Sequence, residues 1–148
     1  MKDSELQAIE KLLYSSENDD VEKELRNCDC YKFLFVYMYN YNWDNGFEIP
    51  VVVMNNQNCD LSTALLMFYR AEGAVYLEGR NLDTSLSKWK DFLDKLYSKI
   101  ICKEYSVSDI RFRVPLSKTQ LFKFKKELSD IEEILIKEIG TIDLEISL

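Results

Sequence analysis

Apolar side chains recur at helical spacing through most of this chain. The longest stripe places seven of them three or four positions apart: Leu86, Trp89, Phe92, Leu93, Leu96, Tyr97 and Ile100. This period puts them on one face of an α-helix, which we expect to begin near Thr84 or Ser85. Shorter stripes that follow N-capping residues predict further helices after Ser4, Asp19 or Asp20, Asp60, Ser117 and Ser129.

Two segments are compatible with either helix or strand. The helix that begins at Asp19 or Asp20 is expected to continue to about Met38, but residues 31–41 are aromatic enough for a strand. Pro50 suits the first turn of a short helix that reaches Met54. The run Val51-Val52-Val53 would instead suit a hairpin strand after an Asn45-Gly46 turn.

Strict alternation of apolar and polar residues marks two segments near the C-terminus, 109–114 and 142–148. Alternation with a period of two is typical of strands. Pairing these segments would set Arg111 and Arg113 beside Asp143 and Glu145. The predicted fold class is therefore mainly α. We expect a single domain over residues 1–148, a bundle of about six helices with a small two-stranded β-ribbon near the C-terminus.

Charge is unevenly distributed along the chain, whose net charge is −7. Residues 1–30 carry nine acids against four bases, and residues 129–148 carry six acids against one base. Residues 81–128 carry eleven bases against six acids. This acidic balance argues against binding to nucleic acid or to an anionic membrane, and it favours a basic protein partner. Solvated helix faces are the simpler explanation of the same pattern.

Histidine is absent, and the four cysteines include a single close pair, Cys28-x-Cys30, which is a poor zinc-binding motif without a second pair. Without imidazole, Ser-His-Asp and Cys-His catalysis are excluded, so we predict no catalytic residue, no metal ligand and no cofactor. We expect Cys28, Cys30, Cys59 and Cys102 to be buried free thiols in a reducing compartment. No apolar run is long enough to span a membrane and no leader is evident, so the expected location is the cytoplasm.

One dense motif, Asn42-Trp43-Asp44-Asn45-Gly46-Phe47-Glu48-Ile49-Pro50, combines aromatic rings with acids around a tight turn. If the rings are exposed, they would anchor a partner. If they are buried, which is the commoner case, they would pack the turn against the core. Asp44 and Glu48 would form a carboxylate pair or, more simply, Asp44 would accept backbone hydrogen bonds. The candidate partner-binding residues are Tyr41, Trp43, Asp44, Phe47 and Glu48.

This motif, together with Cys59-Asp60-Leu61-x-Thr63-Ala64-Leu65 and Phe68-Tyr69-x-Ala71-x-Gly73, resembles the bacterial family called domain of unknown function 4274. The resemblance covers residues 37–73. The chain departs from the family pattern at Asn45, where an acid is common, and at Ser62, where glycine is common. Residues 56–58 stand where His-Pro is frequent, so no role for a histidine carries over. The resemblance implies no catalytic activity and is reminiscent of immunity-like proteins of toxin systems.

The leading hypothesis is a non-enzymatic cytoplasmic protein-binding domain, an immunity-like or antitoxin-like neutraliser of a basic bacterial toxin domain. A carboxylate-based, metal-dependent hydrolase that uses Asp44, Glu48 and Asp60 is one alternative. An adaptor or homo-oligomeric structural protein is another, and the sequence leaves the oligomeric state open.

Overall fold

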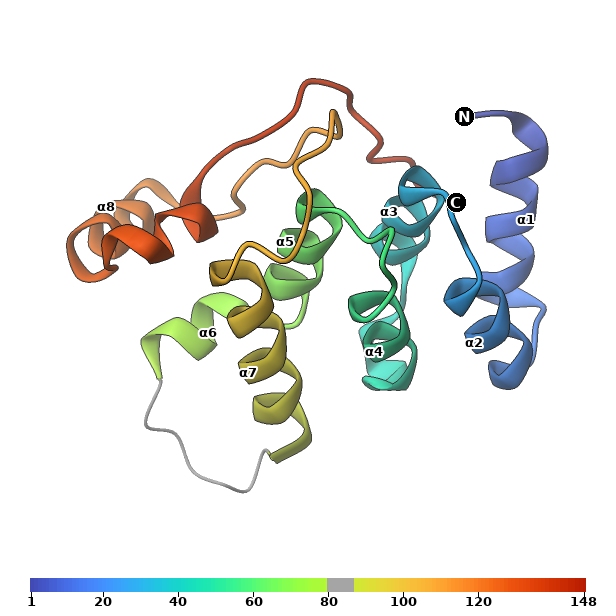
Figure 1. Ribbon diagram of the computed structural model, residues 1–148, viewed down its shortest axis with the longest axis horizontal. Helices are drawn as coiled ribbons and strands as arrows, with labels where there is room; N and C mark the ends of the chain where they lie inside the picture. The colour runs from blue at the N-terminus through green and yellow to red at the C-terminus, as the bar shows by residue number, and fades with distance from the viewer. Residues whose placement is uncertain (80–86) are drawn as a thin grey trace.

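Helices dominate residues 1–79 and 87–148, the parts that the computed structural model describes (Figure 1). The α-helices are α1 (Asp3–Tyr14), α2 (Asn18–Arg26), α3 (Tyr31–Asn40), α4 (Glu48–Met54), α5 (Leu61–Arg70), α6 (Gly73–Glu78), α7 (Ser87–Ile101) and α8 (Lys118–Glu127). Two 3₁₀ helices, η1 (Trp43–Asn45) and η3 (Asp130–Ile136), complete the set in these ranges. The predicted start near Thr84 or Ser85 lies outside the described residues. None of the helices in these ranges is long and apolar enough to cross a membrane.

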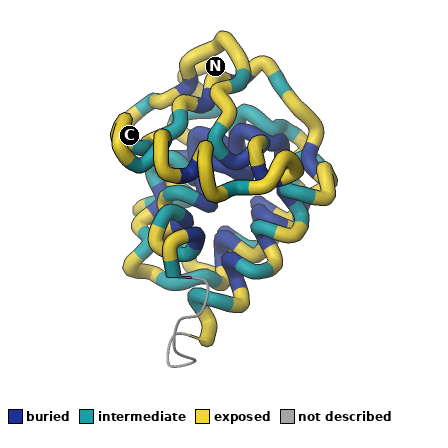
Figure 2. The backbone as a smooth tube through the Cα atoms, turned by 90° about the vertical axis from the view of Figure 1, so that its left-hand side faces the viewer, coloured by how far each residue is buried: buried dark blue, intermediate teal, exposed yellow. Residues whose placement is uncertain are grey.

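Helix α5 occupies the centre of the molecule, between α3 and α7 (Figure 1). Residues 61–68 are all buried, including Ser62 and Thr63. A helix that is apolar or small on every side has no face to give to solvent, so other elements must surround it. Figure 2 shows the buried stretches in the interior and the exposed ones along the outer turns. The outer helices α1, α2 and α8 each turn one face to solvent.

The long helix predicted from residue 19 or 20 to residue 38 is wrong, because the chain breaks between α2 and α3. The Asn56 amide donates to the carbonyls of Leu25 (2.7 Å) and Cys28 (2.9 Å). A continuous helix would need both carbonyls for its own i→i+4 bonds. The side-chain amide of Asn27 also bonds the carbonyl of Lys23, at 2.9 Å. Tertiary and capping bonds therefore end α2.

The predicted two-stranded ribbon is also wrong, because no strand forms in the described ranges. Among the described residues, one isolated bridge, from Ile110 to Ile142, joins the two alternating segments, and a second joins Phe112 to Ile139, which precedes the second segment. Gly140 bends the chain with a φ of +73°, and the carbonyl of Asp109 accepts from both Thr141 and Ile142, each at 2.9 Å. One carbonyl that serves two successive N–H groups interrupts the regular ladder.

The C-terminal residues follow α3 and α1 instead of pairing as a strand. Asn40 donates to the carbonyl of Ile146 (2.7 Å) and accepts from the N–H of Leu148 (2.8 Å). Tyr14 donates to the carbonyl of Leu148 at 3.0 Å. The alternating pattern of residues 142–148 therefore reflects a tail that lies on helices with one side buried.

Several local predictions are confirmed. Residues 31–40 and 48–54 are helical, and Pro50 lies in the first turn of α4. Ser117 forms a capping box with Gln120, although Ser129 does the same for a 3₁₀ helix. At Gly73, the first residue of α6, a Cβ would lie 2.4 Å from the Phe68 ring, so this close approach requires glycine.

The four cysteines are free thiols, but they are not all in the core. Cys59 is buried, Cys28 and Cys30 are half-buried, and Cys102 is exposed. The expectation of four core thiols is therefore wrong for Cys102, which follows the end of α7, where the chain leaves the core.

Candidate functional site

The turn between α3 and α4 is held by its own side chains. The side-chain oxygen of Asn42 accepts from the N–H of Asp44 at 3.0 Å, and the Tyr41 hydroxyl donates to the carbonyl of Gly46 at 2.7 Å. Gly46 has a φ of +92°, in the left-handed region that favours glycine. Asn42, and not Asp44 as predicted, is the side-chain acceptor of the turn.

Three aromatic rings of the turn pack against each other and against α7. The ring of Trp43 lies 5.4 Å from Tyr41 and 6.0 Å from Phe92, centroid to centroid. Phe47 lies 5.2 Å from Phe92. Tyr41 is buried, while Trp43 and Phe47 are half-buried. The rings thus join the turn to the core, and only the outer edges of Trp43 and Phe47 remain for a partner.

The two acids of the turn, Asp44 and Glu48, are both exposed. Glu48 still acts on its surroundings. Burial, and then the negative charge of Glu48, raise the pKa of Tyr41 to about 12. Glu48 and Tyr41 also line one cavity, although Glu48 is exposed.

A small cavity of about 80 Å³ joins this turn to the connection between α1 and α2. Glu48 and Asn45 line it from the turn, and Ser16 and Asn18 line it from the connection. The neighbours of Asn18 in sequence are acidic and exposed, as are the two acids of the turn. Of these acids only Glu48 lines the cavity, and the others belong to the two segments that meet there. We call the five exposed acids of these two segments the acidic face: Glu17, Asp19, Asp20, Asp44 and Glu48.

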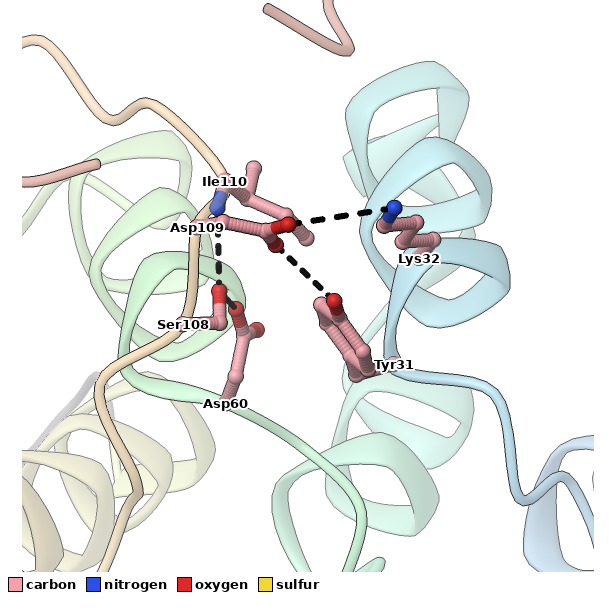
Figure 3. Close-up of polar contacts among 6 residues, drawn as sticks. All are labelled: Tyr31, Lys32, Asp60, Ser108, Asp109 and Ile110. Carbon is pink, nitrogen blue, oxygen red and sulfur yellow. Dashed lines mark hydrogen bonds and ion pairs between the residues drawn. The ribbon is translucent and has the colours of Figure 1, made fainter. Parts of the chain in front are cut away.

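Asp60 takes part in a second polar cluster, at the start of α5 (Figure 3). One of its carboxylate oxygens accepts from the N–H of Thr63 at 3.0 Å, and the other accepts from the Ser108 hydroxyl. The hydroxyl oxygen of Ser108 accepts in turn from the N–H of Ile110 at 3.1 Å. Asp60 therefore caps α5, as the sequence predicts, and also fastens the segment after α7 to it.

Asp109 extends this connection to α3 (Figure 3). Its carboxylate accepts from the Tyr31 hydroxyl at 2.8 Å and lies 3.9 Å from the ammonium of Lys32. Ser108 and Asp109 were not predicted to matter. They lie 48 residues beyond Asp60 and 78 beyond Tyr31 in the sequence, so no local spacing links them.

The carboxylates of the metal-dependent alternative do not share one environment. Asp60 is buried and its oxygens are engaged, whereas Asp44 and Glu48 are exposed. Burial raises the pKa of Asp60, and its hydrogen bonds with Ser108 and Thr63 oppose that rise. Among residues 1–79 and 87–148, no group of three or more Cys, Asp or Glu side chains is arranged to hold a metal ion.

Comparison with known proteins gives one match. Residues 30–101 match the family described as Domain of unknown function (DUF4274), a span that includes the turn and the cap of α5 but neither α1, α2 nor Ser108. No curated protein and no solved structure matches the chain. The matched span contains the motifs at residues 42–50 and 59–73 on which the resemblance rested, and extends beyond them on both sides. Through residues 30–101, this chain belongs to the DUF4274 family.

Proposed function

We propose that this chain is a non-enzymatic protein-binding domain of the bacterial cytoplasm, an immunity-like or antitoxin-like neutraliser of a basic toxin domain. The observation that carries the proposal is the acidic face. Two segments far apart in sequence meet at one small cavity, and both carry exposed acids. Glu48, which lines the cavity, and Asp44 lie on one segment, and Glu17, Asp19 and Asp20 lie on the other.

The carboxylates of the acidic face are available to a partner. Among the described residues, none of the five forms an ion pair. The nearby pair between Arg26 and Glu22, 3.8 Å apart, involves neither the turn nor the start of α2. Unpaired carboxylates on two segments that meet produce a negative potential that speeds the approach of a basic protein.

The half-buried rings of Trp43 and Phe47 lie in the same turn as Asp44 and Glu48. Because their inner faces are already packed against Phe92, a partner would meet rigid apolar edges that cost little conformational entropy to bind. We propose that the carboxylates steer the partner and that these two edges supply part of the affinity.

The experiment is a comparison of partners captured by the tagged chain and by a double variant, Asp44→Lys with Glu48→Lys, at low and moderate salt. The matched control is Glu133→Lys with Glu138→Lys, which changes the net charge equally at two exposed acids outside the acidic face. We expect a basic protein to bind the wild-type chain and the control, to be lost with the double variant, and to dissociate as salt rises.

Co-expression then tests neutralisation directly. A captured toxin domain, when expressed alone, should stop the growth of its host. Co-expression of the wild-type chain should restore growth, and co-expression of the double variant should not. Equal capture by both double variants, or capture of no basic protein at either salt concentration, would contradict the proposal.

A further inference from the structure

A groove of about 630 Å³ lies between the end of α2 and the end of α4. Its size falls within the range of protein sites that hold small molecules or short peptide segments. It lies at the opposite end of α4 from Glu48, so it is separate from the acidic face. Arg26 and Asp29 contribute one charge of each sign to its lining.

The groove is rich in side-chain amides, with five in its lining: Asn27, Asn55, Asn56, Gln57 and Asn58. Asn56 is structural, because its amide bonds the carbonyls of Leu25 and Cys28 and its oxygen accepts from the N–H of Asn58 at 2.7 Å. The remaining four amides surround this fixed base.

These four amides leave both donors and acceptors for a ligand. Asn55 and Gln57 are exposed, and neither side chain forms a hydrogen bond to another described residue. Asn27 and Asn58 use their NH₂ groups on the carbonyls of Lys23 and Cys28, and their side-chain oxygens accept from no described residue. A carboxamide offers two donors and an acceptor with two lone pairs.

The other lining groups point to an uncharged ligand. Arg26 and Asp29 are the charged groups among the described lining residues, and their opposite charges leave that lining with no net charge. Burial raises the pKa of the Cys28 thiol, so this side chain stays neutral and is a poor nucleophile near pH 7. Val51 and Val52 supply apolar contact, and no aromatic ring lines the groove.

We propose that this groove binds an extended, uncharged segment of a partner polypeptide through its main chain. Each peptide unit carries one N–H donor and one C=O acceptor, and free carboxamides complement both. The valines contact small apolar side chains of the bound segment. This site goes beyond the proposed function, because its ligand is recognised by hydrogen bonding and not by charge.

The test is a titration of the isotopically labelled full chain with a blocked, uncharged hexapeptide, acetyl-Gly-Val-Ser-Val-Ser-Gly-amide, followed by amide NMR shifts. We expect saturable shifts confined to residues 26–29 and 51–58 that do not change in high salt. Asn55→Ala with Gln57→Ala should weaken binding about tenfold, because two or more hydrogen bonds are lost. The exposed Gln7→Ala is the control and should bind as the wild type does.

Absence of saturable shifts in this groove, equal binding by the double variant, or strong weakening by salt would overturn the proposal. Maltotriose is the second probe, and equal shifts from it would identify a general hydroxyl and amide binder and overturn the peptide assignment. Because the hexapeptide carries no charge, its failure leaves the salt-dependent capture at the acidic face untouched.

Discussion

Replacing Asp60 by alanine is expected to destabilise the fold by about 3 kcal/mol. The change removes the cap of α5, which is worth about 1 kcal/mol for a typical N-cap. This cap is the bond from the N–H of Thr63, which is fully buried, so its loss costs more than that of a cap in solvent. The hydroxyl of Ser108 also loses its acceptor. An orphaned buried donor costs about 1–3 kcal/mol. Relief from burying a carboxylate, whose pKa is raised by that burial, offsets a part of this sum.

The measurement is equilibrium unfolding in urea at pH 7, followed by circular dichroism and tryptophan fluorescence. Ser117→Ala is the matched control, because Ser117 also caps a helix and forms a capping box but is exposed. It should cost only the cap itself, about 1 kcal/mol. Ser108→Ala should fall between the two, and its effect should not add to that of Asp60→Ala, since both break one hydrogen bond.

The comparison of the two caps decides whether this reasoning holds. If Asp60→Ala costs no more than Ser117→Ala, then the bond from Ser108 contributes nothing. The segment after α7 would in that case be held by its apolar contacts alone. The same conclusion would follow if Asp60→Ala lost about 3 kcal/mol of stability while Ser108→Ala unfolded with the same free energy as the wild type.

Three further predictions concern single positions. Since the pKa of Asp60 is raised above its ordinary 3.8, the folded chain holds this proton more tightly than the unfolded chain does. The free energy of unfolding of the wild type, relative to that of Asp60→Asn, should therefore fall as the pH rises from 3.8 to the raised pKa and then level off. Urea unfolding at several pH values measures this difference, and a difference that increases with pH would contradict the prediction. Gly140→Ala should cost more than about 2 kcal/mol, because its Cβ would lie 2.0 Å from a backbone carbonyl oxygen. Gly46→Ala is the control, because no atom lies within 4 Å of its Cβ, and it should cost only about 1 kcal/mol. Equal unfolding midpoints for the two variants would refute the clash at Gly140. Asn56→Ala should cost about 2–4 kcal/mol, because it removes three hydrogen bonds. The control Asn55→Ala should stay within about 0.5 kcal/mol of the wild type. Thermal unfolding measures both, and similar melting temperatures for the two variants would show that the bonds of Asn56 contribute no net stability.

The helix starts with the strongest local signals were predictable from the sequence. Asp60 and Ser117 each bond an N–H three residues later, so the capping residue and its partner lie within one turn. The stripe from Trp89 to Ile100 likewise records one helix face packed on the core. Such interactions need no knowledge of the rest of the chain.

The errors arose where residues distant in sequence compete for the same backbone groups. The break between α2 and α3 depends on Asn56, which reaches Leu25 from 31 positions away. The alternating residues 142–148 read as a strand, but Asn40 binds them from 106 and 108 positions away. Periodicity reports which side chains are buried, and a tail on a helix buries alternate residues just as a strand does.

The candidate site divides in the same way. Tyr41, Trp43 and Phe47 were predicted as a group because they share one short turn, and the structure brings their rings together. Which parts of those rings face outward was decided by Phe92, on another helix. The clustering of Glu17, Asp19 and Asp20 near the turn was likewise not contained in any local pattern.

By itself, the sequence determined the mainly helical character, the caps at Asp60 and Ser117, the tight turn at Gly46 and the acidic balance, because each depends on neighbours within one helical turn or on composition alone. The caps predicted at Ser4 and at Asp19 or Asp20 are wrong, since Lys2 and Glu17 precede α1 and α2. Only the tertiary structure decided where α2 ends, that no ribbon forms in the described residues, and which carboxylates share a surface. Those outcomes depend on hydrogen bonds and contacts between residues 30 to 110 positions apart, and the free energy of such contacts exists only once the chain has folded.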